Sequence, residues 1–441
     1  MYSAKILQKI NKLKEKAFNN DIFAFANLVI ISMLKLKDFE LSKKILEEII
    51  RKAPPASKKL DVRVWCCEFF GTFDPYKLVK IINNPTLTEA STIIEILFMK
   101  LSDEKKVLKT LLYELLEKLE KNVSLDNDPE KFSFIEILCD IFVATKDNQI
   151  LRKALKVAQD IEEETTQVAA FGEIALGLLE IGRIHEGEEI LKKALKLAEK
   201  QIPYEVATIL CEISVRLAYI DMFDMALKVV ELIDSPLDEM EALKDIASRL
   251  AKKGKFDEAL KIARKLNDFF LTSRSKALHT IAVEMAKAGL INRALDIIQE
   301  IIKTGKYPDN ICHAIKGIDS IAWITKDKSL LEMALKYIEE IKNPRDKSYL
   351  LADTAHIFAK LDCLDTAMNL LNKAIKYAKK IKDEDSKSET FGYIAMHFAA
   401  LEMFDKALEI VKKIRSDYWK INTLLSMIEI KLGILEFELL K

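Results

Sequence analysis

The chain of 441 residues carries 69 lysines and arginines against 69 aspartates and glutamates, so its formal net charge is zero. This balance argues against general nucleic-acid binding, which needs a basic surface. Charged residues make up 31% of the chain and hydrophobic residues 50%, with only 11 glycines and 9 prolines. Such a composition indicates a helical protein without long flexible linkers.

Three features bear on where the protein works. The N-terminal stretch MYSAKILQKINKLKEK is charged throughout and does not resemble a signal peptide. The longest strongly apolar run without charge covers residues 22–34 and is too short to span a bilayer. The six cysteines form no CxxC pair, which suits a reducing compartment. We therefore expect a cytoplasmic protein with no membrane segment.

The N-terminal region, residues 1–165, reads as helices without any strand, because no stretch sustains a period-two alternation. We interpret it as diverged helical repeats, although a separate helical domain with a break near residues 122–128 is the alternative. The predicted helices cover 4–18, then the pairs 21–36 with 39–52, 57–70 with 74–82, 87–101 with 103–121, and 129–145 with 147–164.

A clearer pattern begins after this region, and residues 241–266 show it best. An apolar face with helical spacing runs up to Lys253-Gly254, where glycine accepts the left-handed conformation that ends helices. Phe256 leads into a second helix, so the unit is an antiparallel helix pair. The inward positions of the two helices are Leu243, Ile246, Ala247, Leu250, Ala251, Ala259, Leu260, Ala263 and Leu266.

This unit recurs along the chain, with a small residue in each helix where the two helices would cross. One pair cannot bury its own apolar faces and must stack on its neighbours. The small residue of the first helix is Ala175, Ser214, Ala247, Ala282, Ala322, Ala355 and Ala395. The small residue of the second helix is Gly187, Ala226, Ala259, Ala294, Ala334, Ala367 and Ala407. Both series have the spacings 39, 33, 35, 40, 33 and 40.

The three longer units predict two kinds of insertion. After Gly187 and Ala367 the helical period continues, so we expect a lengthened second helix. After Ala294, the stretch 303–308 contains glycine and proline and predicts a loop.

The repeated unit resembles the tetratricopeptide (TPR) repeat, in which Gly-x-Phe/Tyr-x-x-Ala joins the two helices. Residues 254–259, GKFDEA, match that pattern. The family's tryptophan early in the first helix is absent, and its proline after the second helix appears only as Pro236 and Pro344. The resemblance covers roughly residues 168–415. It implies an all-α, right-handed α-α superhelix: a TPR-like solenoid of antiparallel helix pairs over residues 166–419 that serves as a scaffold for protein binding.

Residues 420–441 are expected to form the capping helix. A cap normally has a polar outer face, yet this one carries leucines and isoleucines around much of its circumference. Two interpretations stay open: a homodimer through this helix, or a cap that folds back into a neighbouring groove. The most apolar side comprises Leu424, Leu425, Ile428, Leu432, Leu435 and Leu439.

The TPR resemblance also implies a concave groove lined by the first helices, at fixed offsets around their small residue. Between 241 and 360 these offsets give seven lysines against Glu241, Asp319 and Asp327. Ammonium groups would pair with an acidic or extended peptide, and the rings of Trp323 and Tyr349 would give flat apolar contacts. The alternative is that these lysines bind no partner and form a solvent-exposed, lysine-rich face. The candidate partner-binding residues are Lys244, Lys252, Lys276, His279, Lys287, Lys316, Trp323, Lys326, Tyr349, His356 and Lys360.

We find no motif that predicts catalysis, a cofactor or a metal site. His185 opens a sequence like HExxH but lacks the second histidine. We therefore predict a non-enzymatic protein that binds another protein or peptide. RNA binding is the alternative, because pentatricopeptide repeats share the helix-turn-helix plan and the Gly-x-x-Asp-Glu-Ala turn. The variable repeat length and the zero net charge count against it. An enzyme built on a helical-repeat body is a third reading, which would need converging acids or histidines.

Overall fold

The structure is a computed structural model that describes residues 4–36, 38–53, 61–201, 203–266, 273–304 and 308–433. Within these ranges every regular element is a helix, and none of the helices combines the length and apolar composition that crossing a bilayer requires. The predicted all-α class is therefore confirmed. The chain divides into two compact units, Met1–Ile209 and Leu210–Lys441.

The first unit consists of helix pairs that follow the predicted order closely. Acidic and hydroxyl side chains cap several N-termini, including Asp38 on α3 and Thr86 on α6. Several predicted boundaries shift: α4 begins at Val62 within the described residues and ends at Phe73 rather than 70, α7 begins at Lys105 rather than 103, and α9 ends at Gln159 rather than near 164. The helices are α1 (Ala4–Phe18), α2 (Ile22–Ile30), the π-helix η1 (Ile31–Lys35), α3 (Phe39–Lys52), α4 (Val62–Phe73), α5 (Pro75–Ile81), α6 (Leu87–Leu101), α7 (Lys105–Asn122), α8 (Asp128–Thr145), α9 (Asn148–Gln159), α10 (Glu164–Glu180) and α11 (Ile184–Ala198).

Helix α12 (Pro203–Tyr219) contains the division between the units. The rest of the second unit alternates long first helices with second helices of varied length. The first helices are α14 (Pro236–Lys252), α16 (Ser273–Lys287), α18 (Pro308–Thr325), α20 (Pro344–Lys360), α22 (Glu384–Ala400) and α24 (Asp417–Leu432). The second helices are α13 (Phe223–Val230), α15 (Phe256–Ala263), α17 (Ile291–Thr304), α19 (Lys328–Glu340), α21 (Leu364–Ala378) and α23 (Phe404–Val411).

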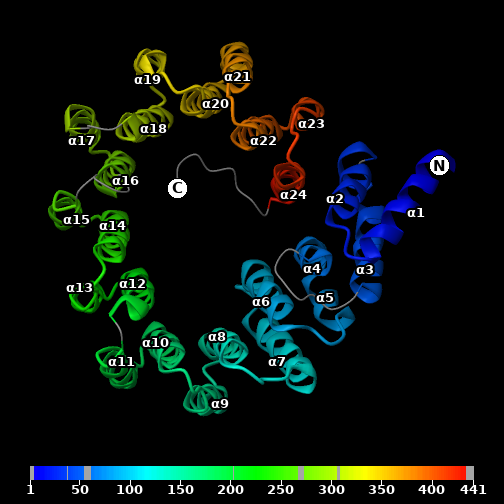
Figure 1. The fold of residues 1–441 in the computed structure, drawn as a ribbon, viewed down its shortest axis with the longest axis vertical. Helices are drawn as coiled ribbons and strands as arrows, with labels where there is room; N and C mark the ends of the chain where they lie inside the picture. Colours follow the sequence, from blue (N-terminus) through cyan, green and yellow to red (C-terminus); the bar gives the residue numbers. More distant parts are fainter. Residues whose placement is uncertain are drawn as a thin grey trace. The chain divides into compact units, whose positions relative to one another are not determined.

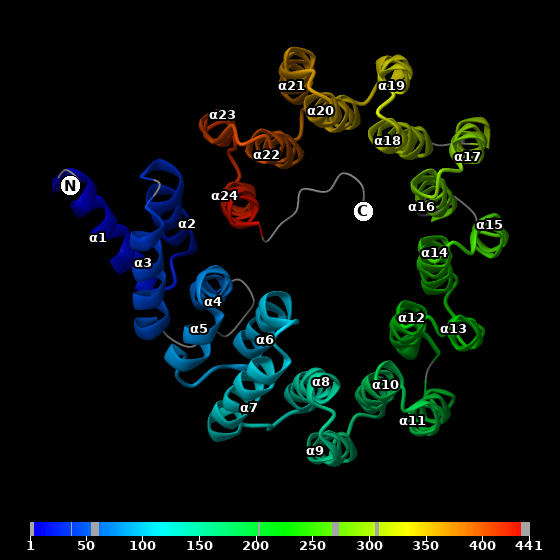
Figure 2. The ribbon, with the colours of Figure 1, turned by 180° about the vertical axis from the view of Figure 1, so that it is seen from behind.

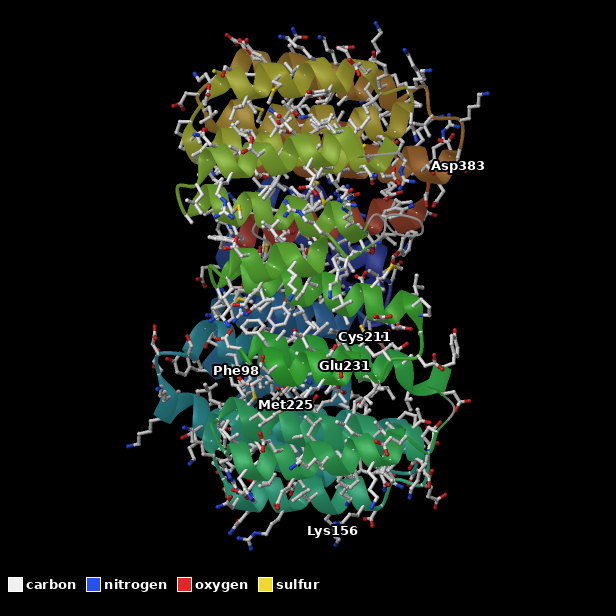
Figure 3. The ribbon with its side chains drawn as sticks, turned by 90° about the vertical axis from the view of Figure 1, so that its left-hand side faces the viewer. Phe98, Lys156, Cys211, Met225, Glu231 and Asp383 are labelled. Carbon is white, nitrogen blue, oxygen red and sulfur yellow. The ribbon has the colours of Figure 1, made fainter. Side chains whose placement is uncertain are left out.

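The first helices of the second unit form an inner row and the second helices an outer row (Figures 1 and 2). From α14 to α24 each first helix packs on the next first helix. Each first helix from α14 to α22 also packs on the second helix of its own pair. Seen from the side, the helices of the second unit lie in successive layers, with Met225 on α13, Glu231 directly after that helix and Asp383 directly before α22 (Figure 3). The inner row is therefore a continuous concave surface.

The small residues of the repeat lie where the sequence predicts, at the crossing of each pair. All of the first-helix and second-helix small residues are buried. At Gly187 a Cβ atom would lie 2.6 Å from Leu179 Cγ and 3.1 Å from the carbonyl oxygen of Ala175, the matching residue of the first helix. The two backbones thus approach too closely there for a larger side chain.

The turn inside each pair depends on a left-handed residue. Gly254 has φ +76°, and the equivalent turn positions Asp362 and Glu402 have φ +60° and +58°. A side chain in this conformation costs roughly 1–2 kcal/mol, so the turn geometry is kept even where glycine is absent.

The lengths of the second helices explain the variable spacing. Helices α11 and α21 have 15 residues, as predicted, against 8 in α13, α15 and α23. The predicted loop over 303–308 is wrong at its ends, because α17 continues to Thr304 and α18 begins at Pro308. The helical period of ALDIIQEIIKT continues through Lys303 and Thr304, the first two residues of the predicted loop.

The capping helix is described as far as Gly433. Helix α24 packs on α22 and α23 and buries Leu424, Leu425 and Ile428. Leu435 and Leu439, which the predicted homodimer would need, lie outside the described residues. The homodimer therefore stays a prediction.

The tight crossing gives a first testable prediction. Replacing fully buried Ala259 with leucine should push α15 away from α14 and lower the free energy of unfolding by about 1–3 kcal/mol. The matched change Lys261→Leu adds a leucine to the exposed side of the same helix and should leave stability within about 0.5 kcal/mol. Urea unfolding followed by circular dichroism measures both, and an equal effect of the two changes would contradict the crossing argument.

Candidate functional site

A polar cavity of about 390 Å³ opens on the concave surface of the second unit, where side chains from five consecutive first helices meet. Most of them lie two, three or six positions before the small residue of their helix. The lining residues are Lys244, Asp245, Ser248, Lys276, His279, Thr280, His313, Lys316, Asp319, Ser320, Asp353, Ile357 and Tyr393. We call this cavity the groove pocket.

Three lysines of the groove pocket differ in how far their charge is already paired. Lys244 contacts the carboxylates of Glu241 and Asp245, the latter at 3.3 Å. The ammonium of Lys316 lies 3.9 Å from Asp353 Oδ2, beyond hydrogen-bonding distance. Lys276 forms no ion pair with any residue that the structure describes. The end of the groove pocket at α16 thus offers an uncommitted cation, Lys276.

Two histidines follow Lys276 along the groove pocket. The rings of His279 and His313 lie 6.3 Å apart, and His279 Nε2 is buried without a hydrogen-bond partner among the described residues. Burial lowers the pKa of His279 to about 3 and that of His313 to about 4, and the nearby Lys316 adds to both shifts. Both rings are therefore neutral at pH 7, and neither competes with lysine for an anion.

The other end of the groove pocket holds two buried carboxyl groups. Asp353 is 2% exposed; its Oδ1 accepts the Tyr393 hydroxyl at 2.5 Å and lies 3.2 Å from His397 Nε2. Asp319 is 4% exposed, and its Oδ2 accepts the Thr354 hydroxyl at 2.7 Å. Burial holds the pKa of Asp319 well above its usual range, and the nearby charge of Asp353 raises it further. The hydrogen bond from Thr354 lowers this pKa but does not outweigh the burial.

Aromatic and imidazole rings pack beside these carboxyl groups. Tyr393 lies 4.3 Å from Tyr349 and 4.8 Å from His397, measured between ring centroids. His356 lies 5.6 Å from His397 and is only 1% exposed. His356, predicted to contact a partner, therefore lies beneath the surface and can act only through its neighbours.

The other predicted residues fall into separate places. Four of them line the groove pocket: Lys244, Lys276, His279 and Lys316. Tyr349 lies beside the pocket, with its ring tilted against that of Tyr393. The remaining five lie toward the C-terminal ends of the first helices. There two ammonium groups lie over the ring of Trp323. That of Lys326 is 2.9 Å from the ring centroid, and that of Lys360 is 5.6 Å from it. Lys252 is exposed, and Lys287 is exposed and paired with Glu284.

Several pocket residues were missed by the sequence reasoning. The family offsets cover the positions six and three residues before the small residue of each first helix, and one and four to five residues after it. They do not include the position two residues before it. That position is polar in five consecutive first helices, which is the signal that would have found it. Its occupants are Asp245, Thr280, Ser320, Asp353 and Tyr393.

A larger cavity of about 670 Å³ lies on the outer side, between α13 and α15 over α14. It is lined largely by apolar side chains and ends at Leu266, the last described residue before position 273.

Among the described residues no group of three or more histidines, cysteines, aspartates or glutamates is placed to hold a metal ion.

The stacked helix pairs and the concave inner row define a TPR-like α-α solenoid. No family model and no curated protein matches the sequence. Solved structures with similarity include Ton1535 from Thermococcus onnurineus NA1, at 16% identity, TM-score 0.31, and coverage of 77% of this chain and 98% of that one. The APC/C heterotetramer Cut9-Hcn1 is another, at 13% identity and TM-score 0.24, with coverage of 95% of this chain and 95% of that one. A human IFIT1 dimer with m7Gppp-AAAA is similar at 12% identity and TM-score 0.25, with coverage of 94% of this chain and 95% of that one. Similarity at these TM-scores says nothing of what this chain binds.

The buried histidines predict how stability depends on pH. Their folded pKa values lie below the unfolded value of 6.5, so the stability they contribute is complete above pH 6.5 and is lost as pH falls toward 4. Each histidine should lower the free energy of unfolding by about 1–2 kcal/mol between pH 7.5 and pH 5. His279→Gln/His313→Gln should flatten the pH dependence of urea unfolding, whereas His185→Gln, at an 85% exposed position, should not. A double variant as acid-sensitive as the wild type would contradict the buried neutral state.

Proposed function

We propose that this protein is a cytoplasmic, non-enzymatic scaffold that binds an extended segment of a partner protein along the concave surface of its second unit. One observation carries the proposal. Equivalent positions of five consecutive first helices converge on the groove pocket, which combines uncommitted lysine charge with hydrogen-bonding side chains. A surface repeated along one direction suits a ligand that is itself extended.

The dimensions support a peptide of moderate length. Neighbouring packed helices lie about 8–10 Å apart, and an extended chain advances about 3.3 Å per residue. Five helices therefore accommodate a segment of about 11 residues. Lys276, which has no ion partner in the described part of the chain, favours an acidic residue near α16.

The six cysteines support the cytoplasmic assignment. All are free thiols, and Cys66, Cys67 and Cys139 are buried. Burial raises the pKa of Cys211 to about 11 and that of Cys312 to about 12, so these thiols are poor nucleophiles. Such cysteines persist in a reducing compartment and provide no obvious catalytic group.

Charge reversal in the groove pocket tests the proposal. Lys276→Glu/Lys316→Glu should abolish retention of a lysate protein that the wild type retains, because the pocket then repels acidic side chains. The control Lys228→Glu/Lys373→Glu changes net charge equally at exposed positions of the outer helices α13 and α21. Affinity purification with quantitative mass spectrometry, with and without nuclease, measures retention.

The outcomes are distinct. A protein lost only with the groove variant supports peptide binding and identifies the partner. Equal retention by all variants contradicts binding at the groove pocket. RNA that is recovered with the wild type and removed by nuclease would favour the RNA-binding alternative.

A further inference from the structure

The groove pocket has two ends of opposite character, and the end formed by α18 and α20 is incompletely paired. Asp353 Oδ2 and Asp319 Oδ1 are buried oxygen atoms with no hydrogen-bond partner among the described residues. Both side chains line the cavity. Leaving a buried acceptor without a donor is unfavourable, so both oxygens favour a ligand that supplies hydrogen-bond donors.

The charge of this end also favours a donor that is positively charged. The nearest cation, the Lys316 ammonium, lies 3.9 Å from Asp353 Oδ2 and its side chain is 44% exposed. Tyr393 and His397 approach Oδ1 of Asp353, so Oδ2 is the oxygen that remains for a further donor. The rings of Tyr349 and Tyr393, which contact each other at an interplanar angle of 49°, add aromatic faces, which attract cations.

We propose that the end of the groove pocket formed by Asp319 and Asp353 holds a lysine side chain of the bound partner segment, with its ammonium between the two carboxyl groups. This inference rests on the proposed peptide-binding function and specifies its ligand. The two open oxygens belong to different helices, so they do not form the single bidentate carboxylate that suits a guanidinium. A compact ammonium with three donors fits two separate acceptors.

The proposal sets the charge pattern of the segment. Its acidic residue would meet Lys276 on α16, and its lysine would meet the carboxyl groups of α18 and α20. One to two helix spacings separate these points, which corresponds to about two to six residues of extended chain. The partner segment therefore carries opposite charges rather than a uniformly acidic run.

Histidine resonances provide a direct reporter of this end of the pocket. The chain has only five histidines, so a spectrum of the full chain with ¹³Cε1-labelled histidine has five signals. His397 and His356 lie beside Asp353, His279 and His313 lie at the lysine end, and exposed His185 is an internal control. Single His→Gln variants assign the signals.

The probe is Nα-acetyl-lysine methylamide, compared at equal ionic strength with the norleucine and glutamate analogues. The lysine probe should shift His397 and His356 along a saturable curve, whereas the uncharged norleucine probe should not. In Asp353→Asn the apparent affinity should fall by on the order of tenfold, since a charge-assisted contact is lost. Asp319→Asn should weaken it less, because burial raises the pKa of the Asp319 carboxyl group and so disfavours its charged form.

Three results would overturn the proposal: no saturable shift in the wild type, an equal response to norleucine, or unchanged affinity in Asp353→Asn. If the unliganded spectrum shows that Asp353→Asn is misfolded, the wild-type titration with the norleucine control decides alone. The probes contain no partner protein. A failed lysine site alongside a positive affinity purification therefore refutes only the ligand assignment, whereas the reverse result refutes only the scaffold function.

Discussion

The close crossing of two small residues in each helix pair is the constraint on which the rest of the structure depends. Where Gly187 meets Ala175, a single added carbon would lie 2.6 Å from a leucine side chain. Such contact fixes how the first helix lies against the second, and therefore which face of the first helix is left to meet the next pair. Because every pair has the same crossing, every first helix presents the same positions to the concave surface.

That regularity explains how polar residues far apart in sequence reach one cavity. Asp245 and Tyr393 lie four repeats apart in the sequence, yet each is two positions before the small residue of its helix. The surrounding apolar packing tolerates the polar cluster, although burial drives His279 toward its neutral form and Asp319 toward protonation. Carboxyl oxygens left without donors lower stability, which is typical of a surface shaped for binding.

Periodicity predicted the fold well, because helix pairing depends on local spacing and on small residues that the sequence shows directly. The crossing positions, the Gly254 turn and most helix bounds followed from it. The pocket was predicted only in part. Lys276 and Lys316 followed from the family offsets, but burial separates His356 from the surface, and the pairing of Lys287 with Glu284 depends on neighbours that no spacing rule fixes. Asp353 was passed over because its offset was not considered.

The charge arrangement also bears on the choice between peptide and RNA. A nucleic acid carries a negative charge at every nucleotide, so a groove that reads it through its backbone should be uniformly basic. Here the lysines of α16 and α18 are followed by the carboxyl groups of Asp319 and Asp353, which give a phosphate no cation to pair with. A polypeptide can alternate the sign of its side chains within a few residues, and the groove pocket alternates on that same scale. The local pattern therefore favours a peptide for the same reason that the zero net charge of the whole chain does.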